Sequence, residues 1–234
     1  MYKESFLMAW ASLIANKMRS ILTMLGIIIG VAAVIALVSI GNGVKQDIQN
    51  SISSLGSNLL MVMPGAPRTP GVRPSAGSMK SLKVSDYEAI AKLDGVKAAS
   101  PMTNGSYVVI YQNKNWTTSV SGVSYNYLDV NNWSMKSGRF LSEKNVQNRE
   151  RVAVVGKTVV KNLFGDEDPV GAEIRVKNIP FRIIGVLNSK GSGAMGNDQD
   201  DMVIIPYTTA MERVEGVDYL RMIYVVGKDE NGID

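Results

Sequence analysis

The pattern of apolar and polar positions changes most sharply at a run of twenty residues near the N-terminus, Ile21 to Ile40. This run contains no charged side chain, and its polar side chains, Thr23 and Ser39, lie close to its two ends. A helix of this length rises about 30 Å, the thickness of the hydrocarbon layer of a bilayer. A helix that is apolar on every side has no face to offer water. The run therefore predicts a transmembrane helix over residues 21–40.

A cleaved signal peptide is the alternative interpretation of this run. Signal peptides have an apolar region of about 7–15 residues followed by a cleavage site with small residues. The run here is longer, and residues 41–50 (GNGVKQDIQN) continue a helical periodicity. We therefore favour the membrane span.

Residues 1–20 are rich in apolar side chains that are interrupted by a polar stripe at helical spacing, formed by Ser5, Ser12, Asn16 and Arg19. Such a stripe is typical of a helix that lies in the membrane interface. We expect a cytoplasmic interfacial helix over residues 1–20, anchored by Trp10, Lys17 and Arg19. The alternative is a plain helical extension of the span.

Small residues lie along one face of the predicted span. Gly26 and Gly30 are four residues apart, and Ala33 extends the same face. Small residues at this spacing allow a second helix to approach closely, although glycine is common in membrane helices in general. We expect helix packing at Gly26, Gly30 and Ala33, with a lipid-facing helix as the alternative.

The helical pattern continues beyond the predicted membrane span. Apolar residues recur at steps of four, four and three among polar ones, at Val44, Ile48, Ile52 and Leu55. We therefore expect an amphipathic stalk helix over residues 41–58. Its apolar face requires a partner, and the chain offers no second stalk.

The remaining residues alternate short strand and helix patterns. Predicted strands cover 59–63, 96–100, 107–111, 116–123, 152–155, 173–176, 181–186, 202–205 and 219–226. A capping box at Ser85 and Glu88 predicts a helix as far as Leu93, and shorter helices are expected at 125–130, 159–164 and 208–214. The Pro- and Gly-rich stretches 64–78 and 188–201 are expected to be flexible loops.

The charge distribution argues against a nucleic-acid partner. The isoelectric point is about 9.2. However, outside residues 1–20 the chain carries only 22 basic and 20 acidic residues, a mixed surface rather than a phosphate-binding face. Lys3, Lys17 and Arg19 precede the span on a short segment, which predicts a cytoplasmic N-terminus and an extracytoplasmic main domain.

Candidate catalytic chemistry is sparse. The chain contains no cysteine and no histidine, which excludes thiol nucleophiles, histidine bases and the common zinc sites. The triplet Gly156-Lys157-Thr158 resembles the end of a phosphate-binding loop, but position 151, where that loop needs glycine, is arginine. The acidic groups at 166–168 and 198–201 lack EF-hand spacing and fit solvated turns. We expect no catalytic residue, metal ligand or cofactor in this chain.

Several stretches together resemble the MacB/FtsX-like permeases of ABC transporters. The segment NKMRSILTMLGIIIGVAAVIALVSIGNG is similar to their first transmembrane segment. The stretches LKVSDYEAI, GRFLSE, RVAVVGKTVVKNLFGDEDPVGAEIRV, FRIIGVL and DDMVIIPYTTA are similar to their periplasmic core domain. The resemblance runs from about residue 5 to residue 226, and residues 152–171 form its most specific part.

The resemblance implies an α+β fold, with a porter-like subdomain at 59–111 and 213–234 and an inserted β-rich subdomain at 112–212. It also implies four membrane helices, so we expect this chain to be the N-terminal part of such a permease, either a fragment or a truncated chain. The implied partners are an ABC ATPase subunit that carries ATP and Mg²⁺, a second permease chain in a dimer, an extracytoplasmic partner such as a periplasmic adaptor, and the lipid bilayer.

These observations favour a permease subunit of an ABC-type exporter or mechanotransmission complex in the cytoplasmic (inner) membrane. In such a complex, ATP hydrolysis on the partner subunit would drive movements of the extracytoplasmic domain. A single-span, membrane-anchored binding or scaffold protein is the alternative, because it needs only one anchor and one α+β domain. A membrane-anchored enzyme is disfavoured by the absence of histidine, cysteine and a carboxylate pair at motif spacing.

Overall fold

A computed structural model describes residues 2–55, 59–65, 80–193 and 196–228 of the chain. The chain divides into two compact units, Met1–Asn50 and Ser51–Asp234. Each unit is described by itself below.

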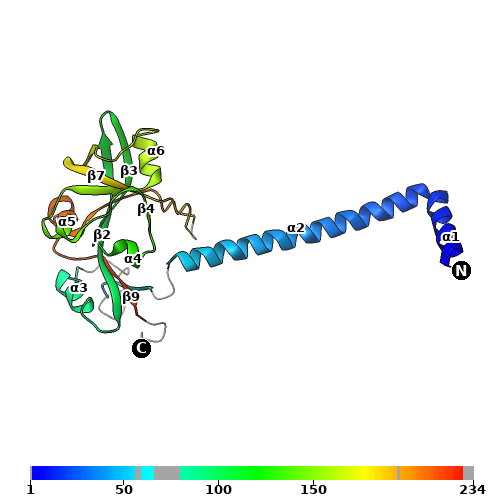
Figure 1. The fold of residues 1–234 in the computed structure, drawn as a ribbon, viewed down its shortest axis with the longest axis horizontal. Coiled ribbons are helices and arrows are strands. Elements are labelled where there is room, and N and C mark those ends of the chain that lie inside the picture. The colour runs from blue at the N-terminus through cyan, green and yellow to red at the C-terminus, as the bar shows by residue number, and fades with distance from the viewer. Residues whose placement is uncertain (1, 56–58, 66–79, 194–195, 229–234) are drawn as a thin grey trace, which may run out of the picture. The chain divides into compact units, whose positions relative to one another are not determined.

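The first unit contains one helix and most of a second, which are separated by a turn at Asn16; the second helix continues five residues past Asn50. The first helix, α1, covers Tyr2–Ala15, and the second, α2, covers Lys17–Leu55 (Figure 1). Within α2, residues 17–46 form a candidate membrane span, and an 18-residue stretch inside it has a mean hydropathy of 2.9. The predicted helix over 21–40 is confirmed as helix, although α2 begins four residues earlier. The predicted helical continuation past Ile40 is also observed.

The second unit contains one nine-stranded sheet. Its strands are β1 (Leu59–Val62), β2 (Val96–Tyr111), β3 (Lys114–Val123), β4 (Met135–Gly138), β5 (Val152–Val155), β6 (Glu173–Val176), β7 (Ile179–Leu187), β8 (Met202–Pro206) and β9 (Met222–Gly227). Their order in the sheet is β1-β9-β2-β3-β8-β5-β7-β4, and β6 pairs with both β2 and β7.

The double pairing of β6 closes part of the sheet into a barrel. The pairings run from β2 through β3, β8, β5, β7 and β6 and return to β2, where Val109 faces Val176 and Ile110 faces Arg175. Most of these contacts are antiparallel, but β3 with β8 and β5 with β7 are parallel. A closed ring leaves none of its six strands as a free edge within the barrel.

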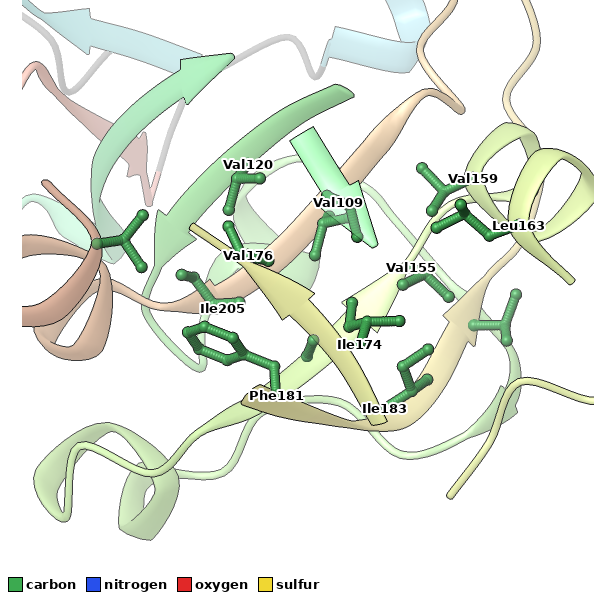
Figure 2. Close-up of a cluster of buried hydrophobic side chains, with 14 of the residues drawn as sticks. Val109, Val120, Val155, Val159, Leu163, Ile174, Val176, Phe181, Ile183 and Ile205 are labelled. Atoms are coloured by element: carbon green, nitrogen blue, oxygen red, sulfur yellow. The ribbon is translucent and has the colours of Figure 1, made fainter. Parts of the chain in front are cut away.

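Alternating apolar residues of the six strands fill the barrel. The strand side chains that Figure 2 labels converge on a common centre, and they are fully buried: Val109, Val120, Val155, Ile174, Val176, Phe181, Ile183 and Ile205. Val203 of β8 belongs to the same buried cluster. Helix α6 (Lys157–Leu163) adds Val159 and Leu163 to this core. Side chains on alternate positions of a strand share one face, which explains why this sequence pattern closes around an apolar interior.

A second apolar cluster lies along β9 and the first part of β2. It includes Ala99, Leu220, Ile223 and Val225, with helix α3 (Val84–Ile90) packed against it. Here the rings of Tyr87 and Tyr207 meet edge to face at 6.1 Å. Burial raises the pKa of Tyr207 to about 12.

The prediction of two separate strands at 96–100 and 107–111 is wrong, because one strand, β2, covers both ranges. Pro101, Asn104 and Gly105 are turn-forming types, but the strand continues through them for 16 residues. Residues 96–102 pair with β9 and residues 102–111 pair with β3, so tertiary pairing overrides the local signal. In Figure 1, β2 runs from beside α3 to its hairpin with β3. The division into a porter-like part and an insert remains a prediction.

Several helix predictions also need correction. The backbone N–H of Lys83 donates to Asp86 at 2.8 Å, so α3 starts at Val84, and Ser85 lies inside the helix rather than at its cap. Helix α3 ends at Ile90 rather than Leu93. The helix expected at 208–214 consists of a short turn, α7 (Tyr207–Thr209), and a π-helix, η1 (Ala210–Glu215).

The remaining short elements agree with the predictions in part. Helix α4 (Tyr127–Val130) confirms the short helix expected there, whereas α5 (Glu143–Gln147) and β4 were not predicted. The last strand begins at Met222, three residues later than expected. The strands predicted at 173–176 and 181–186 are confirmed as β6 and β7, which pair as a hairpin whose two turn residues, Lys177 and Asn178, both have positive φ.

The barrel core leads to a stability prediction. Phe181 is fully buried, so Phe181→Ala should destabilise the domain by about 3–5 kcal/mol through lost burial and a cavity. Urea unfolding followed by near-ultraviolet circular dichroism measures this. Val108→Ala, at a position 48% exposed on the same sheet, is the control and should change stability by less than about 0.5 kcal/mol. Equal effects of the two substitutions would contradict this account of the core.

Candidate functional site

The membrane span of α2 is the most distinctive surface of the chain. The large apolar side chains between Ile21 and Val44 are 53–75% exposed, and none of the span is buried among the described residues. Transferring one such side chain out of water is favourable by about 1.5–3 kcal/mol. The span therefore requires lipid, or other helices, around its whole circumference.

The hydroxyl group of Thr23, near the start of the span, is satisfied within the helix. The Thr23 hydroxyl donates to the carbonyl oxygens of Arg19 at 2.9 Å and of Ser20 at 3.0 Å. A hydroxyl that is bonded to its own helix can enter a bilayer without leaving an unsatisfied donor. This explains how a threonine is accommodated near the start of the span.

The predicted packing residues lie on an open surface. A Cβ atom added at Gly26 or at Gly30 would meet no atom within 4 Å, so no described residue of this chain covers them. Ala33 is exposed on the same helix. The structure therefore leaves this face available, and its use in helix packing remains a prediction.

The predicted cytoplasmic anchor falls on both helices of the first unit. Trp10 lies on α1, 58% exposed, with its ring stacked on that of Phe6 at 6.4 Å. Lys17 and Arg19 lie in the first turn of α2, directly after the break at Asn16. Among the stalk residues, Val44 is 53% exposed, whereas the side chains of Ile48, Ile52 and Leu55 lie outside the described residues.

In the second unit, the Gly156-Lys157-Thr158 triplet holds a loop rather than presenting open amides. The Gly156 N–H donates to the carbonyl of Met202 at 2.9 Å, and the Thr158 N–H donates to that of Asp200 at 3.2 Å. The Thr158 hydroxyl donates to the Asp198 carboxylate at 2.6 Å. A Cβ atom at Gly156 would overlap the carbonyl oxygen of Asp200. Glycine is required here for close backbone approach, which is a structural use of this motif.

The acidic residues at 198–201 hold the same loop. The buried carboxylate of Asp200 accepts hydrogen bonds from the Ser189 hydroxyl and from the N–H groups of Lys190, at 2.8 Å, and Gly191, at 3.2 Å. Asp201 accepts from the indole N–H of Trp116 at 2.8 Å. These carboxylates bind internal donors, and among the described residues no group of acidic side chains could hold a metal ion.

We define the described residues 188–193 and 196–201 as the Asp200 loop. The sequence predicted a flexible segment here, but its hydrogen bonds tie it to Thr158 of α6 and to Trp116 of β3. Lys190 reaches out of this loop to donate to the carbonyl of Asn131 at 2.6 Å, and its ammonium group lies 4.6 Å from the ring centre of Trp133. Burial lowers the pKa of Lys190. Sequence spacing gave no signal for these contacts, because Lys190 lies 59 positions from Asn131 and 57 from Trp133 in the chain.

Comparison with known proteins gives a family match. A family model described as the MacB-like periplasmic core domain matches residues 20–234. The Rhodospirillum rubrum protein called "Macrolide export ATP-binding/permease protein MacB" is 44% identical over the whole of this chain. The protein of the same name from Chlorobium luteolum is 40% identical over 97% of it. The matches cover 36% and 34% of these relatives, so the chain spans about a third of their length.

Solved structures agree with this match. The periplasmic region of MacB from Actinobacillus actinomycetemcomitans superimposes with a TM-score of 0.65 at 28% identity, covering 76% of this chain and 78% of that one. The extracellular domain of the noncanonic ABC-type transporter YknZ from Gram-positive bacteria has the same fold. Its TM-score is 0.60 at 18% identity, over 74% of this chain and 84% of the other.

The contact between Gly156 and the Asp200 loop can be tested by substitution. Gly156→Ala should destabilise the domain by about 1–3 kcal/mol, because the methyl group would displace the loop backbone. The φ angle of −84° is open to alanine, so the effect is steric. Gly65→Ala adds the same methyl group where nothing lies within 4 Å and is the matched control. Urea unfolding that shows no difference between the two would refute this role of Gly156.

Proposed function

The chain belongs to the family of MacB-like periplasmic core domains, and from this premise we propose that it forms the first membrane helix and the extracytoplasmic core of an ABC-type permease. One observation carries the proposal. Helix α2 passes without interruption from the apolar span to Leu55, and the family match begins inside this helix, at residue 20.

The continuity of α2 supports a mechanical role. Its 39 residues rise about 60 Å, and hydrogen bonds along a helix make it a stiff element. A displacement at Lys17 would be carried to Leu55, four residues before β1. In this proposal ATP and Mg²⁺ bind to an ABC ATPase partner, and the helix delivers the resulting movement to the core domain. We infer that this chain itself catalyses no reaction and binds no cofactor.

The exposed surface of the span supports a membrane partner. The face formed by Gly26, Gly30 and Ala33 would allow another helix to approach to the backbone, and a second permease chain in a dimer would supply it. The apolar residues around the rest of the span would contact lipid. A periplasmic adaptor or another extracytoplasmic protein would bind the core domain.

The proposed location is the cytoplasmic (inner) membrane. Lys3, Lys17 and Arg19 precede the span, so the N-terminal helix α1 would stay in the cytoplasm. The core domain would then lie outside.

The assembly is tested by purification from membranes. A tagged chain should recover a nucleotide-binding subunit and ATPase activity. Replacing Gly26 and Gly30 together by leucine should reduce that recovery about tenfold, equal to ~1.4 kcal/mol of assembly energy, because the added side chains keep the helices apart. Mass spectrometry and phosphate release measure the two effects.

The control for this experiment is Ile28→Leu, which preserves an apolar side chain about half a helical turn away from both glycines. It should leave recovery and ATPase activity unchanged. Recovery of the chain alone, or only with outer partners, would favour the membrane-anchored binding or scaffold protein.

The orientation can be tested with single cysteines, because the chain has none of its own. Ser137→Cys on the exposed surface of β4 should react with a membrane-impermeant maleimide when the cytoplasmic membrane is intact. Lys3→Cys on α1 should react only after permeabilisation. The opposite pattern would reverse the proposed topology.

A further inference from the structure

The π-helix η1 packs into two apolar clusters of the core domain. Ala210 and Val214 are buried in the barrel core. Met211, on the same helix, is buried in the second cluster. We call the part of the domain around that cluster the β9 layer, formed by β1, β9, α3 and residues 96–102 of β2. A movement of the barrel relative to the β9 layer would therefore change the packing of η1.

On the barrel side, the end of η1 is held by hydrogen bonds and close packing. The Lys177 ammonium group, in the turn between β6 and β7, donates to the carbonyl oxygen of Val214 at 2.9 Å. The hydroxyl of Thr103, a fully buried residue of β2, donates to Oε1 of Glu215. A Cβ atom at Gly122 of β3 would overlap η1, so glycine is what lets the helix lie this close to the sheet.

On the side of β9, the contact of η1 is looser. The side chain of Glu215 is only 5% exposed, and its oxygen Oε2 accepts no hydrogen bond within the described part of the chain. Nε of Arg221, the residue before β9, lies 3.8 Å from this oxygen, which is an ion pair but too long for a hydrogen bond. This distance can therefore change without a hydrogen bond being broken.

The strand that joins the two parts is paired along only one edge where it passes between them. Residues 96–102 of β2 pair with β9, and residues 109–110 pair with β6. Among the described strands, residues 103–108 pair with β3 alone. A stretch with fewer hydrogen bonds to hold its direction bends more easily than its neighbours. Thr103, the partner of Glu215, is the first residue of this stretch.

We propose that the barrel and the β9 layer move relative to each other by bending of β2 at residues 103–108, and that Glu215 is a latch that restrains this movement. Its carboxylate holds the start of the bend through Thr103 and attracts the start of β9 through Arg221. Release of the latch separates these groups and allows a second orientation of the barrel. The proposal concerns the core domain alone, so its failure would leave the permease assignment intact.

Distances between two spin labels test the movement, because the chain has no cysteine of its own. Glu88→Cys on α3 and Lys161→Cys on α6 place one nitroxide on the β9 layer and one on the barrel, both at exposed positions. The full chain is placed in lipid nanodiscs with an excess of unlabelled chain, so that double electron–electron resonance records distances within one chain. The labelled parent should give one narrow distance component.

Two substitutions release the latch in different ways. Glu215→Ala removes both contacts, whereas Thr103→Val removes the hydrogen bond and keeps the shape of the side chain. Each should produce a second distance component that holds at least about a tenth of the molecules, because loss of a hydrogen bond to a charged group shifts an equilibrium about tenfold or more. The second distance should be the same in both variants, because they release the same movement.

Glu212→Gln is the matched control on the same π-helix. Glu212 also pairs with an arginine, Arg149, at 2.8 Å, but the two side chains are 53% and 58% exposed, so the pair should restrain little. This variant should keep the single component. Phe181→Ala separates the latch from a general loss of stability, because it weakens the barrel core without touching Glu215. It should also keep the single component while circular dichroism shows that it is folded.

Two results would overturn the proposal. One is a single, unchanged distance component in the latch variants when circular dichroism shows that they are folded. The other is the same second component in Glu212→Gln or Phe181→Ala, which would show that any loosening of the domain produces it. Thr103→Val, the milder change, decides the matter if Glu215→Ala does not fold.

Discussion

The organisation of the chain depends on one constraint, which is that the apolar surface of α2 cannot remain in water. Its large side chains from Ile21 to Val44 are more than half exposed on every side of the helix. No internal core of the described residues covers them, so their burial must come from lipid and from other helices. This requirement fixes the first unit at a membrane and leaves the second unit to fold through its own sheet.

In the second unit, by contrast, the apolar residues of short strands are buried by the sheet itself. Strand β6 has only four residues, yet its pairing with both β7 and β2 closes the barrel around Phe181 and Ile183. Strand β2 then extends beyond the barrel to pair with β9, so one strand supports two apolar clusters. The Asp200 loop is bonded to this framework through the N–H and hydroxyl groups of Thr158, and Gly156 leaves room for its backbone.

The parts of the fold that local pattern controls were predictable. The membrane helix, the β6–β7 hairpin and the buried strand β5 follow directly from apolar runs and turn residues. Long-range contacts were not predictable, because no local signal encodes them. Pro101 and Gly105 suggested a turn, but pairing with β9 and β3 keeps β2 continuous, and the Asp198–Thr158 bond joins residues 40 positions apart. For the helix face at Gly26 the sequence indicated the position, whereas the contacts of Lys190 with Asn131 and Trp133 became visible only in three dimensions.

The pairing of the first strand with the last has a mechanical consequence. Leu59 lies opposite Val226 and Val62 opposite Ile223, so the polypeptide enters and leaves the core domain at the same end of one antiparallel pair. A force that pulled Leu59 away from Val226 would break the β1–β9 hydrogen bonds one after another, starting at that end. It would not load all of them at once, as shearing along the strands would. Peeling of this kind needs much less force than shearing. The β1–β9 pair is therefore poorly suited to bearing tension that pulls Leu59 and Val226 apart.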